Sequence, residues 1–509
     1  KCRVMNRLAQ PKAVLAALLL GIFVLATQFV SVGREVIDPD ESTFILMGAD
    51  VARGHLPFVE QFDLKPPMIF LLIGGVLAVF GKSIVAVRLL GDLMLFGTAM
   101  LVFRFARRLS GGWPALGGAL LYIGFASLDL GQPTYSELPA LLFGMGALLV
   151  FAHSPVTPRK AALAGFLLAL TVLSRSNLYQ LPVVFGLLLV IAGLRRSDRV
   201  HPRAWLAYGL GGLAPVAALV AVYAASGHLD VLKLAMIDVP LSYSQQVGPV
   251  EAVIDNIRQF YVATTIAPFI VIPFVLLTVA GFALAALRLL YPADKAERWQ
   301  IVVLFLAALT ILVSLVFSGA VYPHYWLQLL PVLGVFCAIG LAFVARLPFG
   351  KWAALALVLV PIAAALADRL PQSLAVATSP ALRAEPFDVA AAARHIAASG
   401  GRYPSVWPWR KQLVDWYLDA PQLSKAGVQP ENIARPPIVG PLAEHGYVGK
   451  DEVGRIMALV PDFVVTDAKG KGREWIVAAR PDIDAWLDAN YRLDARFGDV
   501  VVYRKITPL

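Results

Sequence analysis

The sequence predicts a polytopic α-helical membrane protein that carries a soluble α/β domain at its C-terminal end. Three observations support this fold class. Hydrophobic residues make up 58% of the 509 residues and charged residues only 15%, whereas soluble proteins average about 45–50% apolar residues. Apolar runs, several of them roughly twenty residues long, recur up to about residue 367, and such runs can cross a hydrocarbon core of about 30 Å. From about residue 368 these runs stop and charged residues become common.

About eleven of the apolar runs are expected to span the membrane. Several are shorter than a usual span, which leaves the count open by about two. The expected spans are 11–32, 83–105, 113–128, 138–152, 161–173, 178–194, 204–225, 262–290, 301–318, 327–345 and 352–366. The run after Pro67 is shorter, and we interpret it as a juxtamembrane or re-entrant helix, because a crossing there would place every later basic loop on the outer side of the membrane.

Basic residues in the short loops indicate the orientation. Lys1, Arg3, Arg7 and Lys12 precede or begin the first span, and the positive-inside rule places them in the cytoplasm. With an odd number of spans, the C-terminal domain then lies on the outer side. We therefore predict a multi-pass protein of the bacterial inner membrane with a cytoplasmic N-terminus, a membrane module over 1–367 and a periplasmic domain over 368–509.

The C-terminal domain has its own secondary-structure signals. The segments PSVWPW, DFVVTD and DVVVYRK are typical of short strands, and FDVAAAARHIAAS and RPDIDAWLDAN are typical of helices. A domain of about 140 residues is large enough to have a core of its own. A longer outer segment is also expected at 226–262.

The charge distribution and the cysteine content exclude a nucleic-acid partner, a disulfide framework and a cysteine metal site. The net charge of +10 is dispersed among the spans rather than gathered on one soluble face, so no nucleic-acid partner is expected. Cys2 and Cys337 are the two cysteines of the chain, which excludes a disulfide framework and a cysteine metal site.

The outer loop 33–67 is unusually rich in charged residues for a chain with few of them. Asp38, Asp40 and Glu41 follow the first span, and Asp63 and Lys65 precede a double proline. One interpretation is structural: Asp40 with Glu41 would start a helix over 41–53, and Lys65 would extend to the membrane interface. The other is functional: Lys65 is held at the outer membrane surface, where the phosphate of a lipid would lie.

Five further polar residues are candidates for a cavity at the outer side. Glu137 is either a cavity carboxylate or a helix-start acid. Arg175 would be costly in a membrane unless it meets a phosphate or an acid. Arg88 is expected to pair with Asp92 one turn on, which outweighs a cavity role. His324 and Tyr325 are candidates for contact with phosphate or sugar, with interfacial anchoring as the alternative for Tyr325.

The acidic loop resembles the first outer loop of GT-C membrane glycosyltransferases. The similarity is strongest to lipid A aminoarabinose transferases and to bacterial relatives of protein O-mannosyltransferases. It rests on Asp40-Glu41, on Gly54-His55-Leu56-Pro57-Phe58 and on Lys65-Pro66-Pro67. Beyond the loop it extends through Phe80-Gly81, Arg88 and Pro323-His324-Tyr325, and it weakens in the C-terminal domain.

The resemblance implies an enzyme that transfers a sugar from a polyprenyl-phosphate donor, such as undecaprenyl phosphate sugar, by an inverting single displacement. It implies that Asp40 is the catalytic base, with Glu41 beside it. It also implies that Lys65 holds the donor phosphate. From their residue types and positions alone, Arg175, His324 and Tyr325 are further candidates for the donor phosphate, and Asp38, Asp63, Glu137 and Arg88 for the cavity. The acceptor would be a glycolipid such as lipopolysaccharide, another glycan, a lipid or a protein.

A divalent cation (Mg, Mn or Ca) is a candidate cofactor. Some members of the family bind one near this loop, and Asp38, Asp40 and Asp63 would supply oxygen ligands. This chain has Leu64 where the aminoarabinose enzymes have Glu, which counts against the metal.

Two rival functions belong to other classes. A transporter or flippase of lipid-linked sugars would be expected to carry ionisable groups near the midplane of the bilayer, often in inverted repeats, but here the acids cluster in one outer loop. A non-catalytic membrane scaffold would leave the acidic loop unexplained.

Overall fold

The computed structural model describes residues 12–128, 133–244, 248–318, 322–378, 387–399, 404–468 and 474–506. The basic residues Lys1, Arg3 and Arg7 lie outside these ranges. By their contacts the residues form two compact units. The helical unit lies within 1–31, 89–221 and 247–379, and the mixed unit within 32–88, 222–246 and 380–509.

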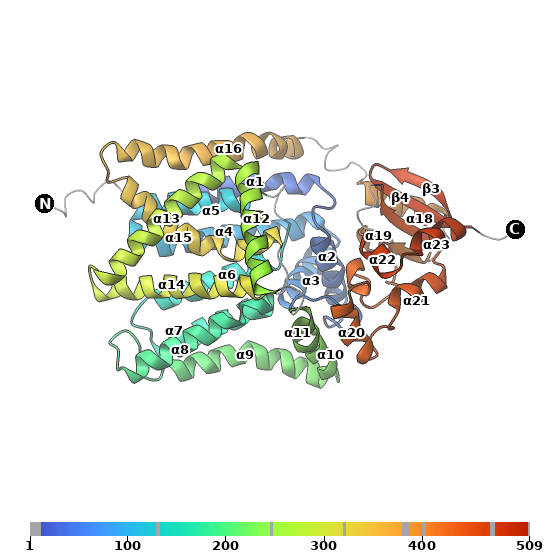
Figure 1. Cartoon of the computed structure of the whole chain (residues 1–509), viewed down its shortest axis with the longest axis horizontal. Coiled ribbons are helices and arrows are strands. Elements are labelled where there is room, and N and C mark those ends of the chain that lie inside the picture. The colour runs from blue at the N-terminus through green and yellow to red at the C-terminus, as the bar shows by residue number, and fades with distance from the viewer. Residues whose placement is uncertain are drawn as a thin grey trace. The chain divides into compact units, whose positions relative to one another are not determined.

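The helical unit consists of apolar helices, most of which run through the segments predicted as spans (Figure 1). Its helices are α1 (Ala13–Gln28), α4 (Ile84–Ser110), α5 (Gly112–Ala126), α6 (Glu137–Ala152), α7 (Pro158–Ser174), η3 (Ser176–Tyr179), α8 (Gln180–Leu194), α9 (Ala204–Ala225), α12 (Pro249–Ile266), α13 (Pro268–Leu290), α14 (Lys295–Val316), η5 (Pro323–Gln328), α15 (Leu330–Val344) and α16 (Gly350–Thr378). The first turn of α4 and the last of α9 belong to the mixed unit.

Each predicted span is largely helical, although the span 262–290 is divided by a break at Ala267, and the prediction of a polytopic helical protein is confirmed. Seven helical segments of the described chain are long and apolar enough to cross a membrane. The helices α5, α6 and α15 are apolar but shorter. The number of spans is therefore approximate, as the short apolar runs of the sequence indicated.

Close packing in the helical unit depends on small residues. At the crossing of α13 and α15, a Cβ added to Gly281 would lie 1.8 Å from the carbonyl oxygen of Phe336, and one added to Gly340 would lie 2.0 Å from that of Leu277. The two backbones approach so closely that only glycine fits. This is how membrane helices gain contact area without a hydrophobic driving force between them.

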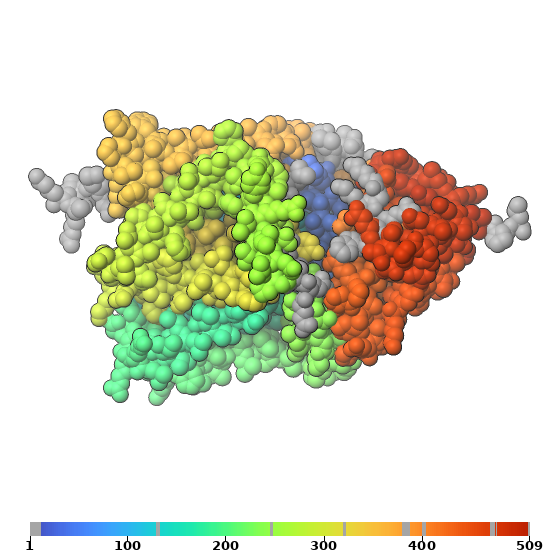
Figure 2. Space-filling view, viewed as in Figure 1, coloured from blue at the N-terminus to red at the C-terminus, as the bar shows by residue number. Residues whose placement is uncertain are grey.

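The predicted outer segment 226–262 is largely helical where the structure describes it. After α9 the chain forms α10 (Leu229–Lys233), the π-helical turn η4 (Leu234–Asp238) and α11 (Val239–Tyr243), and then α12. The break between α12 and α13 falls at Ala267, because Pro268 has no N–H to continue the helix. In Figure 2, α12 (yellow-green) lies on the face toward the viewer. Large apolar side chains such as Ile254, Ile257 and Tyr261 are exposed along it, as expected for contact with lipid.

The mixed unit combines the acidic loop with the C-terminal domain. Its elements are η2 (Phe29–Gly33), which begins in the helical unit, α2 (Pro39–Ala52), α3 (Met68–Phe80), α10, η4, α11, α18 (Asp388–Ser399), β1 (Val406–Pro408), α19 (Leu413–Leu418), η6 (Pro430–Ile433), α20 (Pro436–Glu444), α21 (Glu452–Leu459), β2 (Phe463–Asp467), α22 (Glu474–Ala479), α23 (Ile483–Asn490), β3 (Tyr491–Phe497) and β4 (Val500–Lys505). The helix α3 is about 20 Å long, too short for a crossing.

The strands form one sheet in the order β1-β2-β4-β3. β1 and β2 are parallel, and the other two pairs are antiparallel. The three predicted strands and both predicted helices are present, whereas β3 was not predicted. Its sequence, YRLDARF, alternates apolar residues with Arg492, Asp494 and Arg496, which is the pattern of a half-buried strand, so a local signal for β3 is present in the sequence. Gly498, with φ of 51°, makes the tight turn from β3 to β4.

The boundary predicted between residues 367 and 368 falls inside α16, which continues to Thr378. The division into a module over 1–367 and a domain over 368–509 is a prediction about topology, and it stays one. By its contacts, the acidic loop 33–67 belongs with the C-terminal segment.

Candidate active site

The first turn of α2 orients the two carboxylates that begin the acidic loop. Asp38 is the N-cap residue, and its Oδ1 accepts a hydrogen bond from the backbone N–H of Asp40 at 2.8 Å. Pro39 follows at the first helical position, where no N–H is needed. The helix-start role considered for Asp40 therefore belongs to Asp38, and the Asp40 side chain makes other contacts.

Asp40 forms an ion pair with Lys65. Its Oδ2 lies 3.3 Å from the Lys65 Nζ, and its Oδ1 accepts a hydrogen bond from the Gln429 Nε2 at 3.1 Å. The two charged side chains are 20% and 18% exposed, respectively. The pair is thus held in place by the protein and is still reached by solvent.

The segment before the double proline fixes the backbone of Lys65. Asp63 accepts a hydrogen bond from the Lys65 N–H through Oδ2 at 3.1 Å, and one from the Asn432 Nδ2 through Oδ1 at 3.3 Å. Burial raises the pKa of the Asp63 carboxyl above its ordinary value, and Lys65 opposes that shift. Pro66 and Pro67 then lead directly into α3. Lys65 is therefore positioned by its neighbours on both sides in the chain.

Glu41 forms a separate, buried ion pair with Arg88. The Arg88 Nη2 lies 2.9 Å from the Glu41 Oε2, and the two side chains are 0% and 2% exposed. Arg88 also donates to the backbone carbonyls of Arg34 and Glu35. Glu41 was missed in the sequence analysis, because a contact between residues 47 positions apart leaves no local pattern, and the pairing of Arg88 with Asp92 stays a prediction.

The three candidate metal ligands of the loop all accept hydrogen bonds. Asp38 caps α2, Asp40 bonds Gln429 and pairs with Lys65, and Asp63 accepts two N–H groups. In the part of the chain that the structure describes, no group of three or more His, Cys, Asp or Glu side chains is arranged to hold a metal ion. With an ammonium group beside Asp40, the donor set does not fit a divalent cation.

Three residues that support the loop were missed by the sequence analysis. Gln429 and Asn432 bond Asp40 and Asp63, and both come from the C-terminal segment. Glu35 accepts the N–H groups of Val389 and Ala390, each at 2.8 Å, and thereby caps α18. Burial nonetheless raises the pKa of Glu35. Isolated amides and a single carboxylate carry no motif, so no signal in one sequence could have found them.

The helical unit contains a second charged cluster. Glu137 begins α6, and Arg175 ends α7 in an extended conformation. The Arg175 Nη1 lies 3.2 Å from the Glu137 Oε1, with the side chains 5% and 1% exposed. The structure shows the helix-start role of Glu137 and an acid as partner of Arg175, and a cavity role for Glu137 stays a prediction.

Aromatic residues surround this second cluster. The His324 Nε2 lies 3.9 Å from the Glu137 Oε1, and its ring stacks on that of Tyr135 with centroids 4.6 Å apart. The Arg175 guanidinium lies over the Tyr325 ring, 4.5 Å from its centroid. The sequence candidates Glu137, Arg175, His324 and Tyr325 are therefore brought together.

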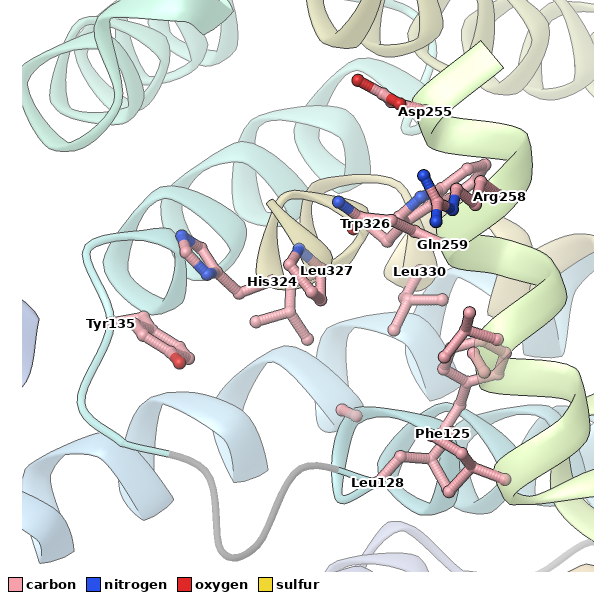
Figure 3. Close-up of a pocket in the computed structure, with 15 residues that line it drawn as sticks. Phe125, Leu128, Tyr135, Asp255, Arg258, Gln259, His324, Trp326, Leu327 and Leu330 are labelled. Atoms are coloured by element: carbon pink, nitrogen blue, oxygen red, sulfur yellow. The ribbon is translucent and has the colours of Figure 1, made fainter. Parts of the chain in front are cut away.

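A cavity of about 570 Å³ opens beside His324 (Figure 3). Tyr135 and His324 stand at one side of it, and Arg258 and Gln259 of α12 at the other. The rest of its wall is largely apolar and includes Phe125, Leu128, Leu327 and Leu330. The cavity therefore combines an apolar wall with one guanidinium, Arg258, one carboxylate, Asp255, and the rings of Tyr135 and His324.

Comparisons with known proteins agree with the resemblance of the loop. Residues 64–221 match the family model described as dolichyl-phosphate-mannose-protein mannosyltransferase. A search of curated proteins gave no match. The fold is similar to that of ArnT from Cupriavidus metallidurans bound to undecaprenyl phosphate, with 15% sequence identity, a TM-score of 0.59 and 98% of each chain covered.

A second likeness is to the archaeal oligosaccharyltransferase AglB from Archaeoglobus fulgidus, solved with an inhibitory peptide and a dolichol-phosphate. It shows 13% identity, a TM-score of 0.53 and coverage of 98% of this chain and 75% of that chain. The family-model match and the likeness of fold agree with the resemblance to GT-C glycosyltransferases that the acidic loop carries.

Proposed function

We propose, from the GT-C fold and the ion pair in the acidic loop, that this protein transfers a sugar from a polyprenyl-phosphate donor to an acceptor hydroxyl. The observation that carries the proposal is the Asp40–Lys65 pair, because it places a carboxylate and an ammonium group together within solvent reach. A transfer of this kind needs a base for the acceptor and a cation for the leaving phosphate.

In the proposed reaction the Asp40 carboxylate takes the proton of the acceptor hydroxyl. The acceptor oxygen attacks the anomeric carbon of the sugar, and the bond from that carbon to the phosphate oxygen breaks. The electron pair leaves with the polyprenyl phosphate, whose charge Lys65 stabilises. A single displacement inverts the anomeric configuration. Gln429 positions the Asp40 carboxylate by donating a hydrogen bond to its Oδ1, while Lys65 lies beside its Oδ2.

Glu41 has a positioning role in this proposal. Its carboxylate is buried against Arg88, so an acceptor cannot reach it without separating that pair. Arg88 in turn bonds the carbonyls of Arg34 and Glu35 and thereby fixes the loop that precedes Asp40.

The second cluster supports a phosphate role for Arg175, His324 and Tyr325 in the helical unit. Arg175 is already paired with Glu137. Arg175 would therefore contact the phosphate while its guanidinium stays paired with Glu137. Multi-pass insertion follows from the apolar helices, and we place the protein in the bacterial inner membrane, with the N-terminus cytoplasmic and the acidic loop outside.

The proposal is tested with the full chain purified into lipid nanodiscs. Wild-type protein, a defined polyprenyl-phosphate sugar and an extract of cell-envelope glycolipids should release polyprenyl phosphate. Asp40→Asn should lower this turnover by about 10²–10⁴-fold, the usual contribution of a general base. Asp238→Asn is the matched control, because Asp238 also pairs with a lysine, Lys233, at 2.7 Å in the same unit and is similarly exposed.

Full activity of Asp40→Asn would exclude the proposed mechanism. If the wild-type protein instead moves the lipid-linked sugar across the bilayer without cleaving it, the flippase alternative is correct. Movement is measured by the access of an impermeant reagent to labelled donor in vesicles.

A further inference from the structure

A set of largely buried amide and hydroxyl groups connects the backbone of α2 to the Asp40 carboxylate within the mixed unit. Gln412, just before α19, donates through Nε2 to the Pro39 carbonyl at 3.1 Å and to the Gln429 Oε1 at 3.3 Å. The Thr43 hydroxyl lies 2.7 Å from the same Gln429 oxygen, closer than to either of two backbone carbonyls. The Gln429 Nε2 then donates to the Asp40 Oδ1 at 3.1 Å. We call Gln412, Thr43 and Gln429 the amide relay.

The Pro39 carbonyl fixes the direction of the hydrogen bonds in this relay. A carbonyl oxygen can only accept, so the Gln412 amide must direct its amino group toward Pro39. The Gln412 Oε1 is buried without a hydrogen-bond partner among the described groups. Turning the amide over would instead place this oxygen against two acceptors, the Pro39 carbonyl and the Gln429 Oε1. Gln412 and Thr43 are 0% and 1% exposed, so water cannot replace the lost hydrogen bonds.

The relay therefore presents a donor, and not an acceptor, to Asp40. With its oxygen held by Gln412 and Thr43, the Gln429 amide has only its amino group left to face the carboxylate. An amino group stabilises an ionised carboxylate and cannot accept from the proton of the neutral acid. A hydrogen bond made to the charged form of a group favours that form. An amide free to turn would serve both forms of Asp40, so the constraint on Gln429 is what selects the ionised one.

We propose that Gln412 and Thr43 are positioning residues that act through Gln429 to hold Asp40 in the ionised form that a general base requires. The proposal rests on the base role of Asp40 proposed above. It gives the C-terminal segment, which supplies Gln412 and Gln429, control over the ionisation of a carboxylate in the acidic loop. Without the relay, Asp40 takes up a proton at a higher pH and cannot deprotonate an acceptor there.

Charged groups near Asp40 also act on its ionisation, but they do not belong to the relay. The ionisable residues of the elements that meet at Asp40 are Asp38 and Glu41 on α2, Asp63 and Lys65 before α3, and Glu431 in η6. Lys65 favours the ionised form, whereas Glu41 and Glu431 are each paired with arginine. The relay is uncharged, so replacing one of its members leaves these charges in place. A shift in the titration of Asp40 then reports the lost hydrogen bonding.

The first measurement titrates Asp40 itself and needs no substrate. Infrared difference spectra of the full chain in nanodiscs are recorded against pH, and the carboxyl C=O band that is absent in Asp40→Asn is assigned to Asp40. Gln429→Leu should raise the midpoint of this band by about one pH unit, as expected for one lost hydrogen bond to a charged group. Thr43→Val should raise it by less, and Thr43→Ser, which keeps the hydroxyl, should leave it at the wild-type value.

Combined variants separate an effect through Gln429 from a general loosening of the structure. If Thr43 and Gln412 act through the Gln429 amide, adding Thr43→Val or Gln412→Leu to Gln429→Leu should shift the midpoint no further. Thr466→Val is the matched control, because Thr466 is also a buried threonine of the mixed unit, 7% exposed, and lies outside the relay. Its midpoint should equal that of the wild type. If the Gln412 variant does not fold, the Thr43 variants decide.

The dependence of kcat/KM on pH gives the second measurement. For the release of polyprenyl phosphate, the acidic limb of the profile should move to higher pH in Thr43→Val, by the same amount as the infrared midpoint. Thr43→Ser should restore the wild-type profile. A merely structural role for Thr43 would lower the rate at every pH and leave the position of the limb unchanged.

Three results would overturn the inference: Gln429→Leu or Thr43→Val leaves the midpoint unchanged, the two shifts add in the double variant, or Thr466→Val shifts the midpoint equally. Turnover that depends on Asp40, together with unshifted midpoints, would refute the relay alone. Shifted midpoints without any turnover by the wild type would instead refute the proposed transfer and keep the relay as a device that ionises Asp40.

Discussion

Two ion pairs, Asp40–Lys65 in the mixed unit and Glu137–Arg175 in the helical unit, each join a carboxylate to a cation but differ in their exposure to solvent. In the mixed unit Asp40 and Lys65 are about one-fifth exposed, whereas in the helical unit Glu137 and Arg175 are almost fully buried. An ion pair in contact with water contributes about 0–1 kcal/mol to stability. Separating a buried pair by removing one partner costs about 3–5 kcal/mol. The exposed pair can therefore exchange its partners for a substrate, and the buried pair cannot.

The largest effect should come from breaking the buried pair. Arg175→Met leaves the Glu137 carboxylate without its guanidinium partner, so we expect a loss of about 3–5 kcal/mol in the free energy of unfolding. The measurement is denaturant-induced unfolding of the protein in detergent, followed by fluorescence. Removing both charges, in Arg175→Met with Glu137→Leu, should restore much of the loss. Equal destabilisation by the single and the double variant would contradict this account.

Breaking the exposed pair should change binding instead of stability. Lys65→Ala should weaken the affinity for undecaprenyl phosphate by about tenfold, the value of one charge-assisted hydrogen bond to the phosphate, and change unfolding by no more than about 1 kcal/mol. Isothermal titration in nanodiscs measures the affinity. Lys82→Ala is the control, because Lys82 pairs with Asp419 in the same unit. Unchanged affinity in Lys65→Ala would remove its phosphate role.

The smallest effect is expected for Asp415, a buried carboxylate whose hydrogen-bond partner is the amide of Gln422. Asp415 accepts a hydrogen bond from the Gln422 Nε2 at 2.5 Å, and burial raises its pKa well above the ordinary value. Its contribution to stability is fully present below the pKa of the unfolded carboxyl, about 3.9, and is lost as the pH rises through the raised value.

Asp415→Asn cannot ionise, so its midpoint of thermal unfolding should exceed that of the wild type by more at pH 8 than at pH 5. The comparison of the two midpoints across this range is the measurement. A difference that stays constant with pH would show that Asp415 ionises in the folded protein as easily as in the unfolded chain.

The sequence was sufficient for those parts of the fold that leave a local pattern. Apolar runs predicted the helices, and the spacing of Asp40-Glu41 and Lys65-Pro66-Pro67 predicted the loop, because both are contiguous in the chain. The partners of these residues are distant in sequence. Glu41 meets Arg88 across 47 residues and Asp40 meets Gln429 across 389. Contacts of this kind depend on the whole fold, which a single sequence does not display.

The cap that Glu35 places on α18 has a consequence for biosynthesis. The mixed unit is built from chain segments within 32–88, 222–246 and 380–509. A ribosome that has translated the acidic loop must still add more than three hundred residues before the α18 backbone can reach Glu35. Until then the loop lacks Gln429 and Asn432 as well. The contacts that Gln429 and Asn432 make with Asp40 and Asp63 therefore form only after residue 432 has been translated, so a product truncated before it would carry the loop without them.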